Sequence, residues 1–138
     1  MYPKAIAEIC AAHGMPAAAL TDRDVLFGAM DFSQALSAAG VQPILGALIS
    51  VERPGTRQIG ARAPIDSLVI LAQDEGGYAN LISLVSTAHL GSEPAEGPHV
   101  TLDQLEAKSA GLIALTAAAD GALARLLAEG QNKAAADY

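Results

Sequence analysis

The segment from Ile44 to Val51 is a nearly continuous run of apolar residues, and it restricts the folds open to this 138-residue chain. Pro43 stands directly before the run, at the opening of the expected strand, where its missing amide donor does least harm. A strand that is apolar on both faces has to be covered on both faces, as the strands of parallel sheets are. The run therefore predicts a buried strand inside a layered α/β fold.

Other apolar segments alternate with helical patterns along the chain. Helices are expected at 3–13, 25–39, 78–91, 101–110 and 121–129, with one more from Asn132, and strands at 17–21, 44–51, 67–72 and 112–116. Thr101 with Gln104 fits a capping box, and Asp120 can cap the next helix. This alternation predicts mainly parallel strands linked by right-handed crossovers. Four strands cannot close an eight-stranded barrel, so the chain is either a small open sheet or a barrel fragment with exposed edges.

Composition limits the classes of function. The chain carries 8 basic and 15 acidic residues, a formal net charge of −7, so it is not expected to hold a phosphate backbone unaided. Cys10 is the only cysteine, which excludes an internal disulfide and fits a reducing cytoplasm. Its helical position beside Ile6 and Ile9 predicts a buried apolar role. No apolar run approaches the ~20 residues of a membrane span.

Asp22 follows the first expected strand, and the carboxyl ends of strands are where α/β proteins bind ligands. Asp22 and Asp24 could share a cation such as magnesium from one loop. The favoured alternative is that they serve the turn and cap the helix that follows. The three histidines, His13, His89 and His99, have no partner at metal-ligand spacing, which favours structural or surface roles.

The segment from Glu52 to Asp66 is the one long irregular stretch, and it holds three arginines, Arg53, Arg57 and Arg62. It is either a solvated, mobile surface loop or a basic contact for nucleic acid or an acidic partner surface. The sequence contains no nucleophile elbow and no glycine-rich fingerprint for a dinucleotide. From its residues alone, the chain is an α/β piece with one suggestive aspartate and no assembled catalytic site.

Several ordered strings resemble a known family. The string GMPAAALTD at 14–22, followed by Leu26-Phe27-Gly28, is similar to the second motif of the PHP (polymerase and histidinol phosphatase) domain, as found in the N-terminal region of bacterial replicative DNA polymerase III alpha subunits. Further strings agree in order and spacing: Phe32 with 39–46, 68–72 with 77–81, 84–86, 111–116 and 126–130. The error-prone paralogue often has Thr-Asp-Arg at the second motif, but the strings at 32–46 and 111–116 fit the replicative version better.

The resemblance implies a partial, distorted (β/α) barrel of PHP type, with residues 1–138 as a single fragment that lacks the first strand and the rest of the barrel. Members that keep their ligands hold up to three metal ions and hydrolyse phosphoesters, in some cases as a 3′–5′ proofreading exonuclease. Where the second motif usually reads Thr-Asp-His, this chain has Arg23 after Asp22. Leu48 stands at the position of a glutamate ligand and Ser67 at that of a histidine. These four positions are read as a vestigial site, with no metal and no catalytic residue expected.

The leading hypothesis is a catalytically inactive structural and docking module of a replicative alpha subunit, whose parent carries out DNA-templated DNA synthesis with Mg. Its expected partners are the rest of that subunit, the proofreading exonuclease subunit, other replicase subunits and, through the parent, DNA. No membrane contact and no cofactor of its own are expected. The alternative is a metal-dependent phosphoesterase or 3′–5′ exonuclease of the PHP family, using Zn or Mn if its site is intact. Open sheet edges also predict self-association.

Overall fold

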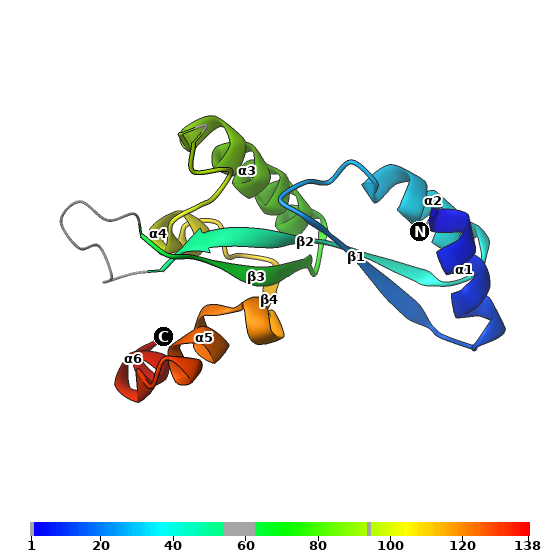
Figure 1. Ribbon diagram of the computed structural model, residues 1–138. Helices are drawn as coiled ribbons and strands as arrows, with labels where there is room; N and C mark the ends of the chain where they lie inside the picture. The colour runs from blue at the N-terminus through cyan, green and yellow to red at the C-terminus, as the bar shows by residue number, and fades with distance from the viewer. Residues whose placement is uncertain (1, 54–62, 94) are drawn as a thin grey trace.

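A computed structural model describes residues 2–53, 63–93 and 95–138 of the chain (Figure 1). Its elements are, in order, α1 (Pro3–Ala12), β1 (Ala17–Arg23), α2 (Ala29–Ala38), β2 (Gln42–Glu52), β3 (Ile65–Ala72), α3 (Glu75–Gly91), α4 (Leu102–Glu106), β4 (Leu112–Leu115), the 3₁₀ turn η1 (Ala118–Asp120), α5 (Ala122–Ala128) and α6 (Asn132–Asp137). The elements expected from the sequence are present, with shifted bounds. In particular, β2 and β3 are longer than expected, and α2 begins at Ala29 rather than at Val25.

The four strands form one sheet in the order β1-β2-β3-β4. β1 and β2 run parallel, whereas β2 with β3 and β3 with β4 run antiparallel. The prediction of mainly parallel strands is therefore wrong for the described strands. A parallel crossover normally needs one helix between its strands. The described residues between β2 and β3 contain no helix, and two helices, α3 and α4, lie between β3 and β4.

The main core lies between the sheet and α3, which covers one sheet face (Figure 1). Alternate residues of β2 point to this face: Ala47, Ile49 and Val51 are at most 1% exposed. They pack with Leu68 and Ile70 of β3 and with residues of α3 and the segment after it: Leu81, Leu84, Ala88 and Val100. Leu48, on the opposite face of β2, is only half-buried. The apolar run of β2 is thus covered fully on one face and less completely on the other.

A second, smaller core joins α1 and α2 to the start of β2. Its buried members include Cys10, which is 4% exposed, and Phe32 and Leu36 of α2. The predicted buried role of Cys10 is confirmed. Because this cluster does not share members with the α3 core, the α1–α2 pair forms its own hydrophobic unit beside the sheet.

Local side-chain bonds fix several helix starts. Asp74 accepts a hydrogen bond from the amide of Gly77 at 2.7 Å and so caps α3. The capping box of Thr101 and Gln104 is confirmed at the start of α4. The prediction that Asp120 caps the next helix is wrong, because Asp120 lies inside η1 and α5 begins without a side-chain cap. Within the described residues, no helix has the length and apolar character needed to cross a membrane.

The start of α3 passes very close to the residue before β4. A Cβ added to Gly77 would stand 1.8 Å from the carbonyl oxygen of Gly111, so one backbone or the other would have to move. We predict that Gly77→Ala lowers the free energy of unfolding by at least about 2 kcal/mol in urea denaturation. Gly76→Ala is the matched control, since its Cβ would meet nothing closer than 3.4 Å. Equal stability of the two variants would contradict this packing.

Candidate functional site

Three of the four positions that were predicted to form a vestigial site meet on one face of the sheet. Arg23 pairs with Leu48 across β1 and β2, and Leu48 pairs with Val69 on β3. Directly paired residues point to the same face of a sheet, and so do residues two apart on one strand. Ser67 therefore lies on this face too, and its hydroxyl accepts a hydrogen bond from Nη1 of Arg23 at 3.1 Å. We call Arg23, Leu48 and Ser67 the Arg23 face.

Asp22 does not belong to the Arg23 face. It precedes Arg23 on the same strand, so its side chain points to the opposite face. A Cβ added to Gly28 would lie 3.3 Å from Oδ2 of Asp22, which places this carboxylate against the start of α2. Asp22 itself is exposed. The structure thus brings together Arg23, Leu48 and Ser67 and leaves Asp22 on the other face, so the four positions predicted as one vestigial site do not lie together.

Asp24 has a different environment from Asp22. It is 5% exposed and adopts the left-handed conformation, with φ of 54°. Its carboxylate accepts two hydrogen bonds from Ser50, one from the amide at 2.7 Å and one from the hydroxyl at 2.8 Å. Asp24 does not cap α2, whose N-cap is Gly28 with no side-chain bond. Its carboxylate is used instead to tie the end of β1 to β2.

The contacts of Asp24 extend in two further directions. Its amide donates to the carbonyl of Leu48 at 3.0 Å, and its own carbonyl oxygen lies 2.8 Å from Nε2 of His89 on α3. Ser50 in turn accepts from the amide of Val100 at 3.0 Å. The contact between Asp24 and Ser50 therefore connects β1, β2, α3 and the segment before α4.

Sequence reasoning missed the roles of Ser50 and His89. Ser50 is the one hydroxyl residue in the apolar run of β2, and a buried polar side chain requires a partner, so it carried a usable signal. Nothing in the sequence around His89 indicated its contact with the carbonyl oxygen of Asp24. His99 bonds locally, with Nδ1 3.0 Å from the carbonyl oxygen of Gly97, and His13 lies exposed at the end of α1. Across the described ranges, no three His, Cys, Asp or Glu side chains gather as a metal site would require.

Arg53 differs from the expectation of a solvated loop arginine. It is 5% exposed, and its guanidinium bonds both oxygens of Asp66, at 2.6 and 3.0 Å, and Glu129 of the segment after α5 at 3.2 Å. The hydrogen bond to Asp66 raises the pKa of Arg53, because it favours the charged guanidinium. Arg125 of α5 also lies 3.3 Å from Asp66. Arg57 and Arg62, the other two candidate contact residues, lie outside the described residues.

The chain is an α/β domain with a four-stranded mixed sheet and helices packed around it. The chain belongs to the PHP domain family, because the family model described as "PHP domain" matches residues 1–138.

Several relatives are DNA polymerase subunits. The chain is 42% identical to the DNA polymerase III subunit alpha of Caulobacter vibrioides, covering 92% of this chain and 11% of that protein. It is 38% identical to the error-prone DNA polymerase of Symbiobacterium thermophilum, covering 88% of this chain and 12% of the relative. The alpha subunit of Pseudomonas aeruginosa is 34% identical, with 94% and 11% covered. The chain thus spans about a tenth of the length of these relatives.

Among solved structures, the chain is similar to one from Bifidobacterium adolescentis that was assigned as a metal-dependent phosphoesterase. The TM-score is 0.44 at 16% identity, over 64% of this chain and 28% of that one. A likeness of this size does not by itself define the fold.

The contact between Asp24 and Ser50 leads to a stability prediction. Asp24→Ala leaves two buried donors of Ser50 without an acceptor and places alanine at a positive φ, so we expect a loss of about 2–4 kcal/mol in the free energy of unfolding. Asp24→Asn keeps an acceptor and tolerates this backbone conformation, so its loss should stay near 1 kcal/mol. Urea denaturation measures both, with Asp22→Ala as the exposed control. If Asp24→Ala lowers the free energy of unfolding no more than Asp22→Ala does, the buried bonds between Asp24 and Ser50 do not stabilise the fold as described.

The cluster around Asp66 predicts a sensitivity to alkaline pH. Partial burial raises the pKa of Tyr138, and the negative charge of Asp66 raises it further, while Arg53 lowers it. The neutral phenol is therefore favoured in the folded chain. Its contribution to stability is complete below the ordinary tyrosine pKa of about 10 and is lost as pH rises through the raised pKa of the folded state.

We expect Tyr138→Phe to reduce the loss of urea stability between about pH 9 and pH 11, the range around the tyrosine pKa. Tyr2→Phe, at a tyrosine that is 85% exposed, is the matched control. If Tyr138→Phe and the unsubstituted chain show the same alkaline slope, Tyr138 does not make this contribution.

Proposed function

We propose that this chain is a catalytically inactive structural and docking module of a DNA polymerase III alpha subunit. The observation that carries the proposal is the hydrogen bond between Arg23 and Ser67 beside Leu48. By the family resemblance, these are the positions at which metal-holding members place histidine, glutamate and histidine. Here an arginine, a leucine and a serine occupy them.

The chemistry of these three side chains opposes metal binding. A guanidinium keeps its positive charge at any pH a protein experiences, so Arg23 repels a cation. Leu48 offers no donor atom. The hydroxyl of Ser67 already accepts from Arg23, and a neutral serine hydroxyl is not among the ligands that zinc prefers. The Arg23 face is better suited to holding the sheet together than to hydrolysing a phosphoester.

The relatives supply the setting for this module. Their names are those of DNA polymerase III alpha subunits and an error-prone DNA polymerase, and the chain spans about a tenth of them. In our proposal, DNA-templated synthesis with Mg belongs to the rest of the parent, in the cytoplasm. This segment supports that parent and docks the proofreading exonuclease subunit. The identity to the Caulobacter alpha subunit, 42% against 38% for the error-prone enzyme, supports the replicative type.

A thermal melt with zinc, with manganese and with a chelator tests the proposal. A metal at ~100 times its dissociation constant stabilises a folded chain by ~2.7 kcal/mol, which is a shift of several degrees in Tm for a domain of this size. We expect a cooperative transition whose midpoint does not move. The triple variant Arg23→His, Leu48→Glu, Ser67→His is the positive control, because three such ligands on one face suffice for a zinc site.

The opposite result would favour the alternative function, a metal-dependent enzyme. A metal-dependent rise in Tm of the unsubstituted chain contradicts an inert site. The metal-dependent phosphoesterase or 3′–5′ exonuclease would then become the leading function, and nuclease assays with the same metals would follow.

A further inference from the structure

Four charged side chains alternate in sign where the end of the chain meets the sheet. Asp66 of β3 and Arg53, just after β2, form the buried centre, with side chains 2% and 4% exposed. Arg125 of α5 lies 3.3 Å from Asp66, and Glu129, just after α5, lies 3.2 Å from Arg53. From one end to the other, the series is positive, negative, positive, negative. The sheet supplies one charge of each sign, and so does the end of the chain.

Helical geometry places the two charges at the end of the chain. Arg125 and Glu129 are four residues apart, so they lie side by side on one surface of the helix. Arg53 and Asp66 stand at adjacent strand ends, where the amide of Arg53 donates to the carbonyl of Pro64 at 2.9 Å. Two neighbouring charges on the helix thus face two neighbouring charges of opposite sign on the sheet. This match fixes the orientation of α5, because a helix turned end for end would oppose like charges.

We call residues 122–138, which contain α5 and α6, the C-terminal arm. The arm lies on the opposite side of the sheet from α3 (Figure 1). Its buried apolar residues are few and mostly small: Ala122, Leu126 and Ala135. Among the described residues, neither of the two hydrophobic cores includes a member of the arm. Because the arm shares no apolar residue with these cores, its charged contacts form a main part of its attachment to the sheet.

The two halves of this charge series differ in their exposure to water. Arg53 and Asp66 are buried and bond each other directly, so they would stay paired within the sheet if the arm moved away. The side chains of Arg125 and Glu129 are 43% and 48% exposed, so water and salt can replace their contacts. Opening of the arm would therefore strand no buried charge, and closing would restore a contact specific in sign and position.

We propose that the C-terminal arm is a reversible latch: it opens from the sheet as a unit while the rest of the chain stays folded, and its two charges, Arg125 and Glu129, close it. Such an opening is a local transition that takes less free energy than global unfolding. Salt should favour the open arm, because ~1 M salt shortens the range of interaction between exposed charges to ~3 Å. The inference concerns the fold of this chain and does not depend on the proposed docking role.

Amide hydrogen exchange of the full chain, followed by NMR, tests the proposal. The amides of Gln131 and Ala135 report on the arm, and those of Asp24 and Val100 report on the sheet; all four are hydrogen-bonded. In the unsubstituted chain, the protection factors of the arm reporters should be at least about tenfold lower than those of the sheet reporters. Salt at ~1 M should lower protection in the arm more than in the sheet.

A charge swap on the arm tests the role of the charges. The double variant Arg125→Glu, Glu129→Arg keeps the net charge and the pair four residues apart, but it places like charges opposite each other across the contact. It should lower the protection of the arm reporters at least about tenfold and leave the sheet reporters unchanged.

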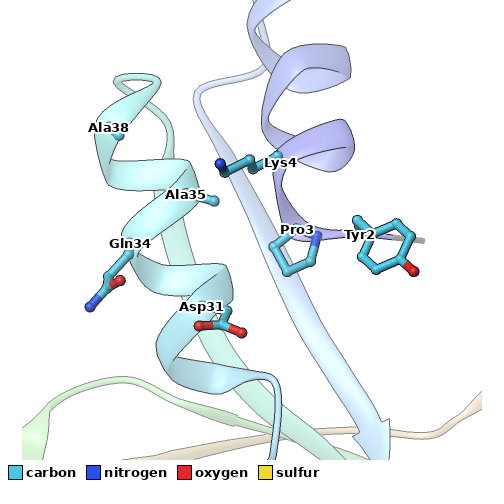
Figure 2. A pocket seen from close by; sticks show the side chains of 7 residues that line it. All are labelled: Tyr2, Pro3, Lys4, Asp31, Gln34, Ala35 and Ala38. Carbon is cyan, nitrogen blue, oxygen red and sulfur yellow. The ribbon is translucent and has the colours of Figure 1, made fainter.

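The matched control is the double variant Lys4→Glu, Glu8→Lys on α1, which swaps another pair four residues apart. Lys4 lines an open hollow between α1 and α2 (Figure 2). Both residues are exposed, and neither forms an ion pair within the described part of the chain. The control should leave the protection of all four reporters as it is in the unsubstituted chain.

Three results would overturn the latch. Equal protection of the arm and the sheet in the unsubstituted chain would mean that the arm does not open separately. A charge swap that changes the arm reporters no more than the control does would remove the role of the charges. The milder variant Glu129→Gln, which also serves if the swapped chain does not fold, should lower arm protection about threefold. No change in that variant would likewise count against the latch. The metal melt tests the proposed function separately.

Discussion

The bond between Asp24 and Ser50 ties the end of β1, a strand that packs against the α1–α2 core, to β2, whose residues form part of the α3 core. One edge of β2 has two successive neighbours: β1 pairs with it as far as Leu48, and Val100 pairs with it at Val51. Between them the amide of Ser50 has no strand partner, and the Asp24 carboxylate supplies the missing acceptor. A buried amide without an acceptor would cost about 1–3 kcal/mol. The left-handed turn at Asp24 meets this need and also sends the chain away toward α2.

The sequence predicted those parts of the fold that depend on local chemistry. The capping box at Thr101 and the burial of Cys10 need only neighbouring residues, and both are confirmed. The direction of β3 was beyond such reasoning, because an apolar strand reads the same in either direction. The role of Arg53 was hidden for another reason: its partners, Asp66 and Glu129, are 13 and 76 residues away along the chain.

One feature of the candidate site, the separation of Asp22 from Arg23, could have been predicted from the sequence but was not. Asp22 and Arg23 are neighbours, and neighbours on a strand face opposite sides, so the two could not share one site if β1 continued through both. The placement of Arg23, Leu48 and Ser67 together required the pairing register, which composition and periodicity do not give. The hydrogen bond between Arg23 and Ser67 depends on that register as well.

The Arg23 face also limits how this chain could change over evolutionary time. Glutamate at position 48 alone would stand beside a guanidinium and pair with it rather than with a metal. Histidine at position 67 alone would remove the hydroxyl that Arg23 now bonds, and histidine at position 23 alone would lack two companion ligands. Under the proposed function the three positions are coupled, because a metal ligand introduced at one of them forms a metal site only if the other two change as well.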